Sequence, residues 1–135
     1  MLSHVMIGIG DFDRAYSFYA ALAAELGLKP FFTNPEASSA AWRGKDGGRP
    51  NLFIGRPFDK QSMVPSNGGM IAFLAADRPT VDRCHAVAMA LGGTDEGAPG
   101  LREYYHPSYY GAYFRDPDGN KLCVVCHTAP QPGGI

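Results

Sequence analysis

The sequence repeats one pattern twice, and this repeat limits the possible folds more than any other feature. An apolar, strand-like run at residues 4–9 is followed by a short polar turn and by apolar residues at helical spacing over residues 15–26. The same order recurs, with an apolar run at residues 70–75 and a helical pattern over residues 81–91. Because an internal repeat indicates repeated structural units, we expect each half to begin with a strand followed by a helix.

Residues at the ends of both helical patterns agree with this interpretation. Asp11 or Asp13 can cap the N-terminus of the first helix, and Thr80 can cap the second. Each pattern stops at a glycine, Gly27 in the first half and Gly92 in the second, as is common at helix C-termini.

Three further strand-like segments follow each helix. They are residues 29–33, 40–44 and 51–56 in the first half and residues 94–106, 109–115 and 121–127 in the second. Each half is therefore predicted to be a β-α-β-β-β module, with module one at about 1–57, a linker at about 58–67 and module two at about 68–128. A helix covers one face of each sheet, so the uncovered faces should come together. The sequence predicts a single α+β domain over residues 1–135, with a cupped eight-stranded mixed sheet and the helices outside.

The charge balance and the first residues of the chain exclude several function classes. The chain has 12 Lys and Arg and 13 Asp and Glu residues, for a net charge of −1, whereas nucleic-acid binding requires a basic face. No apolar run is long enough to span a membrane, and the first residues lack the pattern of a secretion signal. We therefore expect neither a nucleic-acid nor a membrane partner. The three cysteines are an odd count in a chain without an export signal, so we also expect a reduced, cytoplasmic protein.

The stretch K-L-C-V-V-C-H at residues 121–127 contains the C-x-x-C-H pattern of covalent haem attachment. The two valines between the cysteines favour a strand, in which residues three apart point to opposite faces. Cys123 and Cys126 are therefore not expected to share a haem, a cluster or a zinc ion. We interpret the stretch as a buried strand with Cys126 on the helix side and His127 just beyond its end.

Two longer motifs resemble those of a known family. H-V-x-I-G-I-x-D-F-D-R-A-x-x-F-Y, which begins at His4, and F-R-D-P-D-G-N-K-L near the end are similar to motifs of the glyoxalase / bleomycin resistance / dioxygenase family, the vicinal oxygen chelate superfamily. The resemblance extends from His4 to about His127 and implies the paired β-α-β-β-β fold, a homodimer and a small-molecule ligand or substrate. It also implies a divalent metal held by histidines and glutamates at four inward-pointing positions.

The positions that match the family's metal ligands are occupied by His4, Phe53, Met70 and Cys123. Only His4 is of a type that the family uses there, so we expect no metal and no other cofactor, with a bound divalent metal as the alternative. His4, Met70 and Cys123 together would suit copper(I), and Cys123 could act as a nucleophile if His4 activated it. The simpler interpretation is a neutral cavity histidine and an inert thiol.

The predicted ligand-binding cavity comprises these four residues together with Tyr109 and Tyr110, from the aromatic stretch at residues 102–115. A pocket mouth and a dimer interface would both account for that stretch. Trp42 and Arg43 are neighbours on one predicted strand, so only one of them can face the cavity.

Three functions remain open. A small-molecule binding protein that has lost the ancestral metal site needs only the cavity, and we prefer this interpretation. The alternatives are a metal-dependent enzyme, either a lyase of the lactoylglutathione lyase type or an extradiol-type dioxygenase, and a metal-independent enzyme. In the last case His4, His106 or Tyr110 would be the acid or base.

Overall fold

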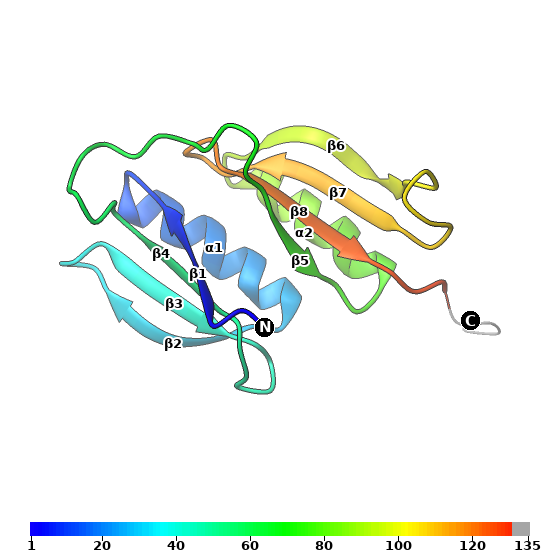
Figure 1. Cartoon of the computed structure of the whole chain (residues 1–135), viewed down its shortest axis with the longest axis horizontal. Helices are drawn as coiled ribbons and strands as arrows, with labels where there is room; N and C mark the ends of the chain where they lie inside the picture. Colours follow the sequence, from blue (N-terminus) through cyan, green and yellow to red (C-terminus); the bar gives the residue numbers. More distant parts are fainter. Residues whose placement is uncertain (131–135) are drawn as a thin grey trace.

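The computed structural model describes residues 1–130, and Figure 1 shows two β-α-β-β-β modules in this part of the chain. Module one consists of β1 (His4–Gly8), α1 (Phe12–Leu26), β2 (Lys29–Asn34), β3 (Ser39–Arg43) and β4 (Asn51–Gly55). Module two consists of β5 (Ile71–Leu74), α2 (Arg78–Ala90), β6 (Thr94–Leu101), β7 (Tyr110–Arg115) and β8 (Lys121–Cys126). The predicted α+β fold of two such modules is confirmed. Neither helix of the described part has the length and apolar character needed to cross a membrane.

The eight strands form two four-stranded mixed sheets, one in each module. The strand order is β1-β4-β3-β2 in module one and β5-β8-β7-β6 in module two. In each sheet the first strand runs parallel to the last strand of its module, and the remaining pairs are antiparallel. Hydrogen bonding therefore follows the repeat and does not continue from one sheet to the other.

Side-chain caps determine where both helices begin. Asp11 accepts a hydrogen bond of 3.0 Å from the backbone N–H of Arg14, and α1 ends at Gly27, which has a φ of +74°. The prediction that Thr80 caps α2 is wrong, because the cap is Asp77. Its carboxylate accepts hydrogen bonds from both the backbone N–H and the hydroxyl of Thr80, at 2.9 and 2.6 Å. The helix therefore begins before Thr80.

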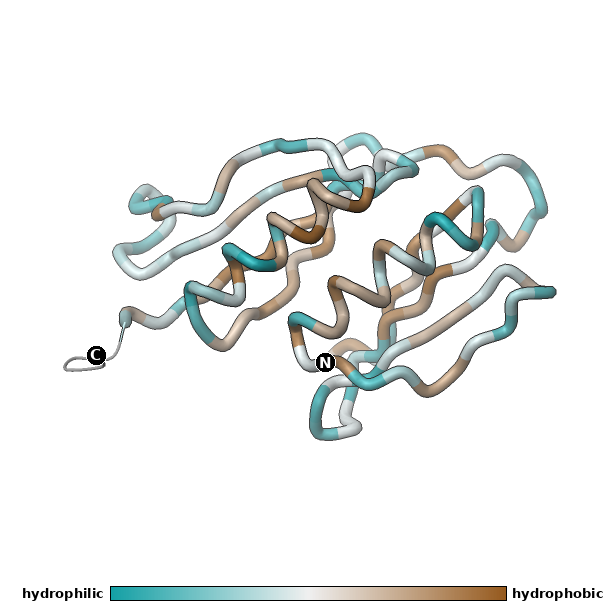
Figure 2. The backbone as a smooth tube through the Cα atoms, turned by 180° about the vertical axis from the view of Figure 1, so that it is seen from behind, coloured by the Kyte–Doolittle hydropathy of each residue, from teal (hydrophilic) through white to brown (hydrophobic). Residues whose placement is uncertain are grey.

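Both helices lie on the same side of the molecule, behind the sheets in Figure 1 and in front of them in Figure 2. They are joined at the surface by an ion pair of 2.9 Å between Arg83 and Glu25. A single buried core beneath them includes residues of both modules, among them Phe18, Leu22, Ile54, Phe114, Leu122 and Val124. We call the side of each sheet that faces away from its helix the open face.

The turn at residues 116–120, between β7 and β8, connects module two to module one. Asn120 Nδ2 donates a hydrogen bond of 2.9 Å to the carbonyl of Gly8, and the backbone N–H of Gly10 donates one of 3.1 Å to Asp118. Arg14 also pairs with Asp118, at 3.1 Å. The D-P-D-G-N sequence therefore makes a joint between the modules as well as a tight turn.

Candidate functional site

The open face of module one carries a group of aromatic side chains. His4 on β1 contacts Phe53 on β4, with ring centroids 5.5 Å apart, and Phe53 contacts Phe31 on β2 at 5.9 Å. The Arg43 guanidinium lies 4.1 Å from the centroid of the Phe31 ring. Trp42, the neighbour of Arg43, is buried in the core. Of these two neighbours, it is Arg43 that lies on the open face.

The open face of module two carries two tyrosines and a thiol. The hydroxyls of Tyr109 and Tyr113 are 2.8 Å apart, and Tyr109 Oη lies 3.7 Å from Cys123 Sγ. Burial raises the pKa of each of these three groups, so all are neutral at neutral pH. Cys126 lies on the opposite face, in the core. The two cysteines of C-x-x-C therefore point to different sides of β8, as the strand interpretation predicted.

The three candidate acid–base residues lie in different places. Tyr110 is on the helix side of its sheet, where its hydroxyl donates a hydrogen bond of 2.6 Å to Asp82 on α2, and this bond raises the pKa of the tyrosine. His106 Nε2 lies 2.8 Å from His127 Nδ1, and the two rings are stacked. His4 is on the open face of module one. Within residues 1–130, no hydrogen bond or ring contact joins any two of the three candidates.

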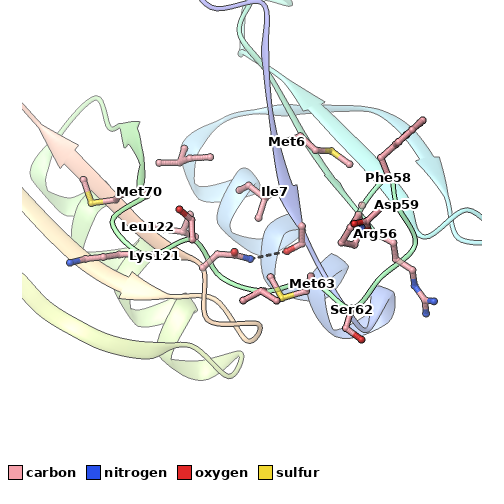
Figure 3. Close-up of a pocket in the computed structure, with 18 residues that line it drawn as sticks. Met6, Ile7, Arg56, Phe58, Asp59, Ser62, Met63, Met70, Lys121 and Leu122 are labelled. Atoms are coloured by element: carbon pink, nitrogen blue, oxygen red, sulfur yellow. Dashed lines mark hydrogen bonds between the residues drawn. The ribbon is translucent and has the colours of Figure 1, made fainter.

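A groove with a volume of about 640 Å³ lies between the two modules, beneath the connection from β4 to β5. Figure 3 shows methionines from three segments on its wall: Met6 on β1, Met63 in the connection and Met70 before β5. Met63 packs against β1 at Gly8. If Gly8 carried a Cβ, that atom would lie 3.6 Å from the Cβ of Met63. Of the residues predicted to form the cavity, only Met70 lines this groove.

The connection between the modules contributes more to the groove than a linker was expected to. Phe58, Met63 and Val64 all line it, and the Phe58 side chain is fully exposed. The sequence did contain a signal for this role: the segment has three large apolar side chains among residues that are otherwise mostly polar or proline. Phe58 and Val64 remain largely exposed, and exposed apolar side chains grouped in this way indicate a binding surface.

The chemistry of the four family positions does not fit a divalent metal. His4 offers one imidazole, Phe53 has no donor atom, and Met70 has only a thioether. Burial raises the pKa of the Cys123 thiol, which disfavours the thiolate that binds metal. Zinc, nickel and iron(II) sites need about three good nitrogen, oxygen or thiolate donors. In the part of the chain that the structure describes, no three His, Cys, Asp or Glu side chains are placed to hold a metal ion.

Comparison with known proteins identifies relatives that match most of the chain. The model of the Glyoxalase/Bleomycin resistance protein/Dioxygenase superfamily matches residues 1–124. A glyoxalase/bleomycin resistance protein from Albidiferax ferrireducens T118 is 36% identical, with 93% of this chain and 98% of that chain covered and a TM-score of 0.83. None of the curated proteins is a significant match.

More distant solved structures share the fold. A glyoxalase/bleomycin resistance protein/dioxygenase family enzyme from Burkholderia phytofirmans PsJN is 21% identical, covers 93% of this chain and 98% of its own, and has a TM-score of 0.70. A lactoylglutathione lyase from Agrobacterium tumefaciens is 23% identical, with coverages of 93% and 92% and a TM-score of 0.61. At these identities the likeness concerns the fold alone.

Proposed function

Because the chain belongs to the Glyoxalase/Bleomycin resistance protein/Dioxygenase superfamily, we propose that it binds a small organic molecule between its two modules, without a chelated metal ion. The observation that carries this proposal is the methionine-lined groove of about 640 Å³. Its volume falls within the roughly 300–1,000 Å³ that is typical of sites for small ligands.

The lining of the groove favours an apolar ligand. Met6, Met63 and Met70 are unbranched and polarizable, and such side chains adapt to ligands of different shapes. Met6 and Met70 are also substantially exposed, at 55% and 45%. A ligand seated in the groove would remove this apolar surface, and that of Phe58, from water.

The donor chemistry favours binding over metal-dependent catalysis. The lyase and dioxygenase alternatives both require a chelated metal, and the residues at the four family positions supply too few donors for one. The lactoylglutathione lyase relative is only 23% identical, so it supports the fold and not that activity. We therefore propose that the protein sequesters or carries its ligand and needs no cofactor.

The open faces of the two sheets support a homodimer. Leu74 on β5 is 72% exposed, and every residue of β2 is exposed. A second copy of the chain would cover this surface and the free edge strands. Three buried free thiols also suit a reducing compartment, so we place the protein in the cytoplasm.

The groove can be tested with N-phenyl-1-naphthylamine, a neutral apolar probe that fluoresces when it leaves water. We expect saturable binding to the native protein and an affinity about tenfold lower in the double variant Phe58→Ser/Met63→Ser, because the ligand loses two apolar contacts. Leu91→Ser is the matched control, since Leu91 is a partly exposed apolar residue at the end of α2, outside the groove. Equal affinity in the native protein and the double variant would refute the proposal.

A further inference from the structure

Two cations lie against one aromatic ring on the open face of module two. The guanidinium carbon of Arg102 is 5.5 Å from the centroid of the Tyr113 ring, and Lys121 Nζ is 5.8 Å from it. Both distances are within the range in which a cation is attracted to an aromatic ring. Tyr113 is therefore a common contact for two positive charges from different segments, the residue just after β6 and the first residue of β8.

Local backbone structure holds Arg102 in this position. Its Nη2 donates a hydrogen bond of 2.9 Å to the carbonyl of Ala98. A Cβ on Gly97 would lie 3.1 Å from Nη2 of Arg102, and one on Gly100 would lie 3.2 Å from Nη1. The two glycines thus leave the space that the guanidinium occupies over β6. Because the group is held in advance, little side-chain entropy is lost when it binds an anion.

Neither cation has a carboxylate partner in the described part of the chain. The ion pairs there involve other basic residues, and the arginine paired on the same sheet is Arg115, with Glu96. The carboxylate next to Arg102 in sequence belongs to Glu103, whose side chain is exposed and forms no ion pair with it. Two partly buried positive charges without a counter-ion favour the binding of an anion.

Lys121 links this cationic pair to the groove. It lines the groove together with Met70, and Figure 3 shows both on the module-two side. Another cation, Arg56, lies on the module-one side, but the carboxylate of Asp59 lines the same part of the groove and reduces its positive field. The module-two end therefore holds two positive charges against one ring, and the carboxylate that lines the groove lies on the other side.

We propose that the ligand is an amphiphilic organic acid whose apolar body lies in the groove and whose anionic group lies between Arg102 and Lys121, beside Tyr113. This inference rests on the proposed function, because it assigns a ligand class to the same groove. A guanidinium pairs well with a planar or tetrahedral oxyanion. The Tyr113 and Tyr109 hydroxyls lie on the same face, 2.8 Å apart; one donates to the other, which leaves one O–H of the pair to donate a further hydrogen bond.

Two fluorescent probes that share one apolar skeleton, only one of them anionic, distinguish the contribution of the anionic group to the affinity from that of the apolar body. 8-Anilinonaphthalene-1-sulfonate carries a sulfonate that N-phenyl-1-naphthylamine lacks. We expect the native protein to bind the sulfonate about tenfold more tightly than the neutral probe. Raising the salt concentration should weaken the binding of the sulfonate and leave that of the neutral probe unchanged.

Variants then assign the effect to the two cations. In Arg102→Gln/Lys121→Gln the advantage of the sulfonate, measured as the ratio of the two probe affinities in the same variant, should disappear. Because Lys121 lines the groove, the neutral probe serves as the internal reference in each variant. The charge-matched control Lys29→Gln/Lys45→Gln removes two exposed positive charges of module one and should retain the advantage. Circular dichroism establishes that each variant is folded, and the salt dependence of the native protein requires no variant.

The outcomes distinguish the two proposals. If the neutral probe binds in the groove but the sulfonate binds no better, or its advantage survives in Arg102→Gln/Lys121→Gln, the anionic-ligand proposal is refuted and the groove remains a binding site. If neither probe binds the native protein, both proposals fail.

Discussion

Tyr19 on α1 donates a hydrogen bond of 2.5 Å to Asp116 Oδ2, at the start of the turn between β7 and β8. Both residues are buried. Asp116 also accepts hydrogen bonds from the backbone N–H groups of Asp118 and Asn120 and from the Asn120 side chain. The bond therefore joins the helix of module one to the turn that bounds the groove, at the centre of the joint between the modules.

Removing this hydroxyl should destabilise the protein. We expect Tyr19→Phe to lower the free energy of unfolding by roughly 1–3 kcal/mol, because a buried acceptor loses a donor. Tyr16→Phe is the matched control, since the Tyr16 hydroxyl has no hydrogen-bond partner within residues 1–130. Urea unfolding measures both, and equal losses in the two variants would contradict the assignment.

The same residue predicts a dependence on alkaline pH. Burial, followed by the charge of Asp116 and the hydrogen bond to it, raises the pKa of Tyr19 well above the ordinary tyrosine value. A group with a raised folded-state pKa contributes its full stability below its unfolded pKa, about 10 for tyrosine, and loses it at higher pH. The native protein should therefore lose stability above about pH 10 more steeply than Tyr19→Phe.

The cap of α2 predicts an acid dependence of opposite sign. Hydrogen bonds from the side chain and backbone of Thr80 lower the pKa of Asp77. A lowered pKa means that the contribution to stability is present above the unfolded value, about 3.9, and is lost as the pH falls through the folded value. Asp77→Ala should cost about 1 kcal/mol at pH 7. Asp77→Asn should retain the cap but show no loss of stability from this residue at acid pH. Thermal unfolding of the native protein and both variants at pH 7 and pH 3 tests the two expectations.

The fold was predictable because successive side chains of a strand point to opposite faces of the sheet, so the pattern of apolar residues indicates which face is buried. Val5 and Ile7 pack on the core while His4 and Met6 lie on the open face, as a period of two requires. The same rule separates Tyr109 from Tyr110, which the sequence analysis had assigned to one cavity. Tyr110 lies an even number of residues from the core residues of β7, and this spacing was the signal for its place on the helix side.

The groove could not be predicted in this way. It depends on how the connection between the modules packs, for example Met63 against Gly8 and Pro65 against Gly119. These contacts join residues far apart in the chain, and no periodicity relates them. The contact of Arg102 and Lys121 with one ring could not be predicted from residue spacing either. The position of Arg102 depends on the register shifts in β6 and on the path of the chain just after this strand.

The thiols should be inert in the folded protein. Burial raises the pKa of Cys84 to about 12, so very little reactive thiolate exists at pH 8. Cys123 and Cys126 are buried as well. We expect 5,5′-dithiobis(2-nitrobenzoate) to react with all three thiols only at the rate of unfolding, and at once in guanidinium. Rapid native reaction at Cys123, located by peptide mass analysis, would show instead that the open face of module two admits the reagent.

The proposed dimer makes a prediction about Leu74. If a second copy covers the surface around Leu74, Leu74→Asp should shift the protein from dimer to monomer, because a charge would be buried in an apolar contact. Leu91→Asp changes an exposed leucine just after α2, on the helix side, and should remain dimeric. Light scattering at several concentrations distinguishes these results. A native protein that is monomeric throughout would exclude the dimer.

Metal analysis tests the loss of the ancestral site. The untagged protein should contain less than one equivalent of any transition metal, because among the four family positions only His4 is of a type that the family uses as a ligand. Dialysis against a chelator should leave the melting temperature unchanged, since no binding free energy would be lost. His4→Ala is the informative comparison, because a metal held by the family site must depend on this imidazole. A stoichiometric metal that is absent from His4→Ala would restore a metal-dependent enzyme as the leading interpretation, with Cys123 as the next ligand to examine.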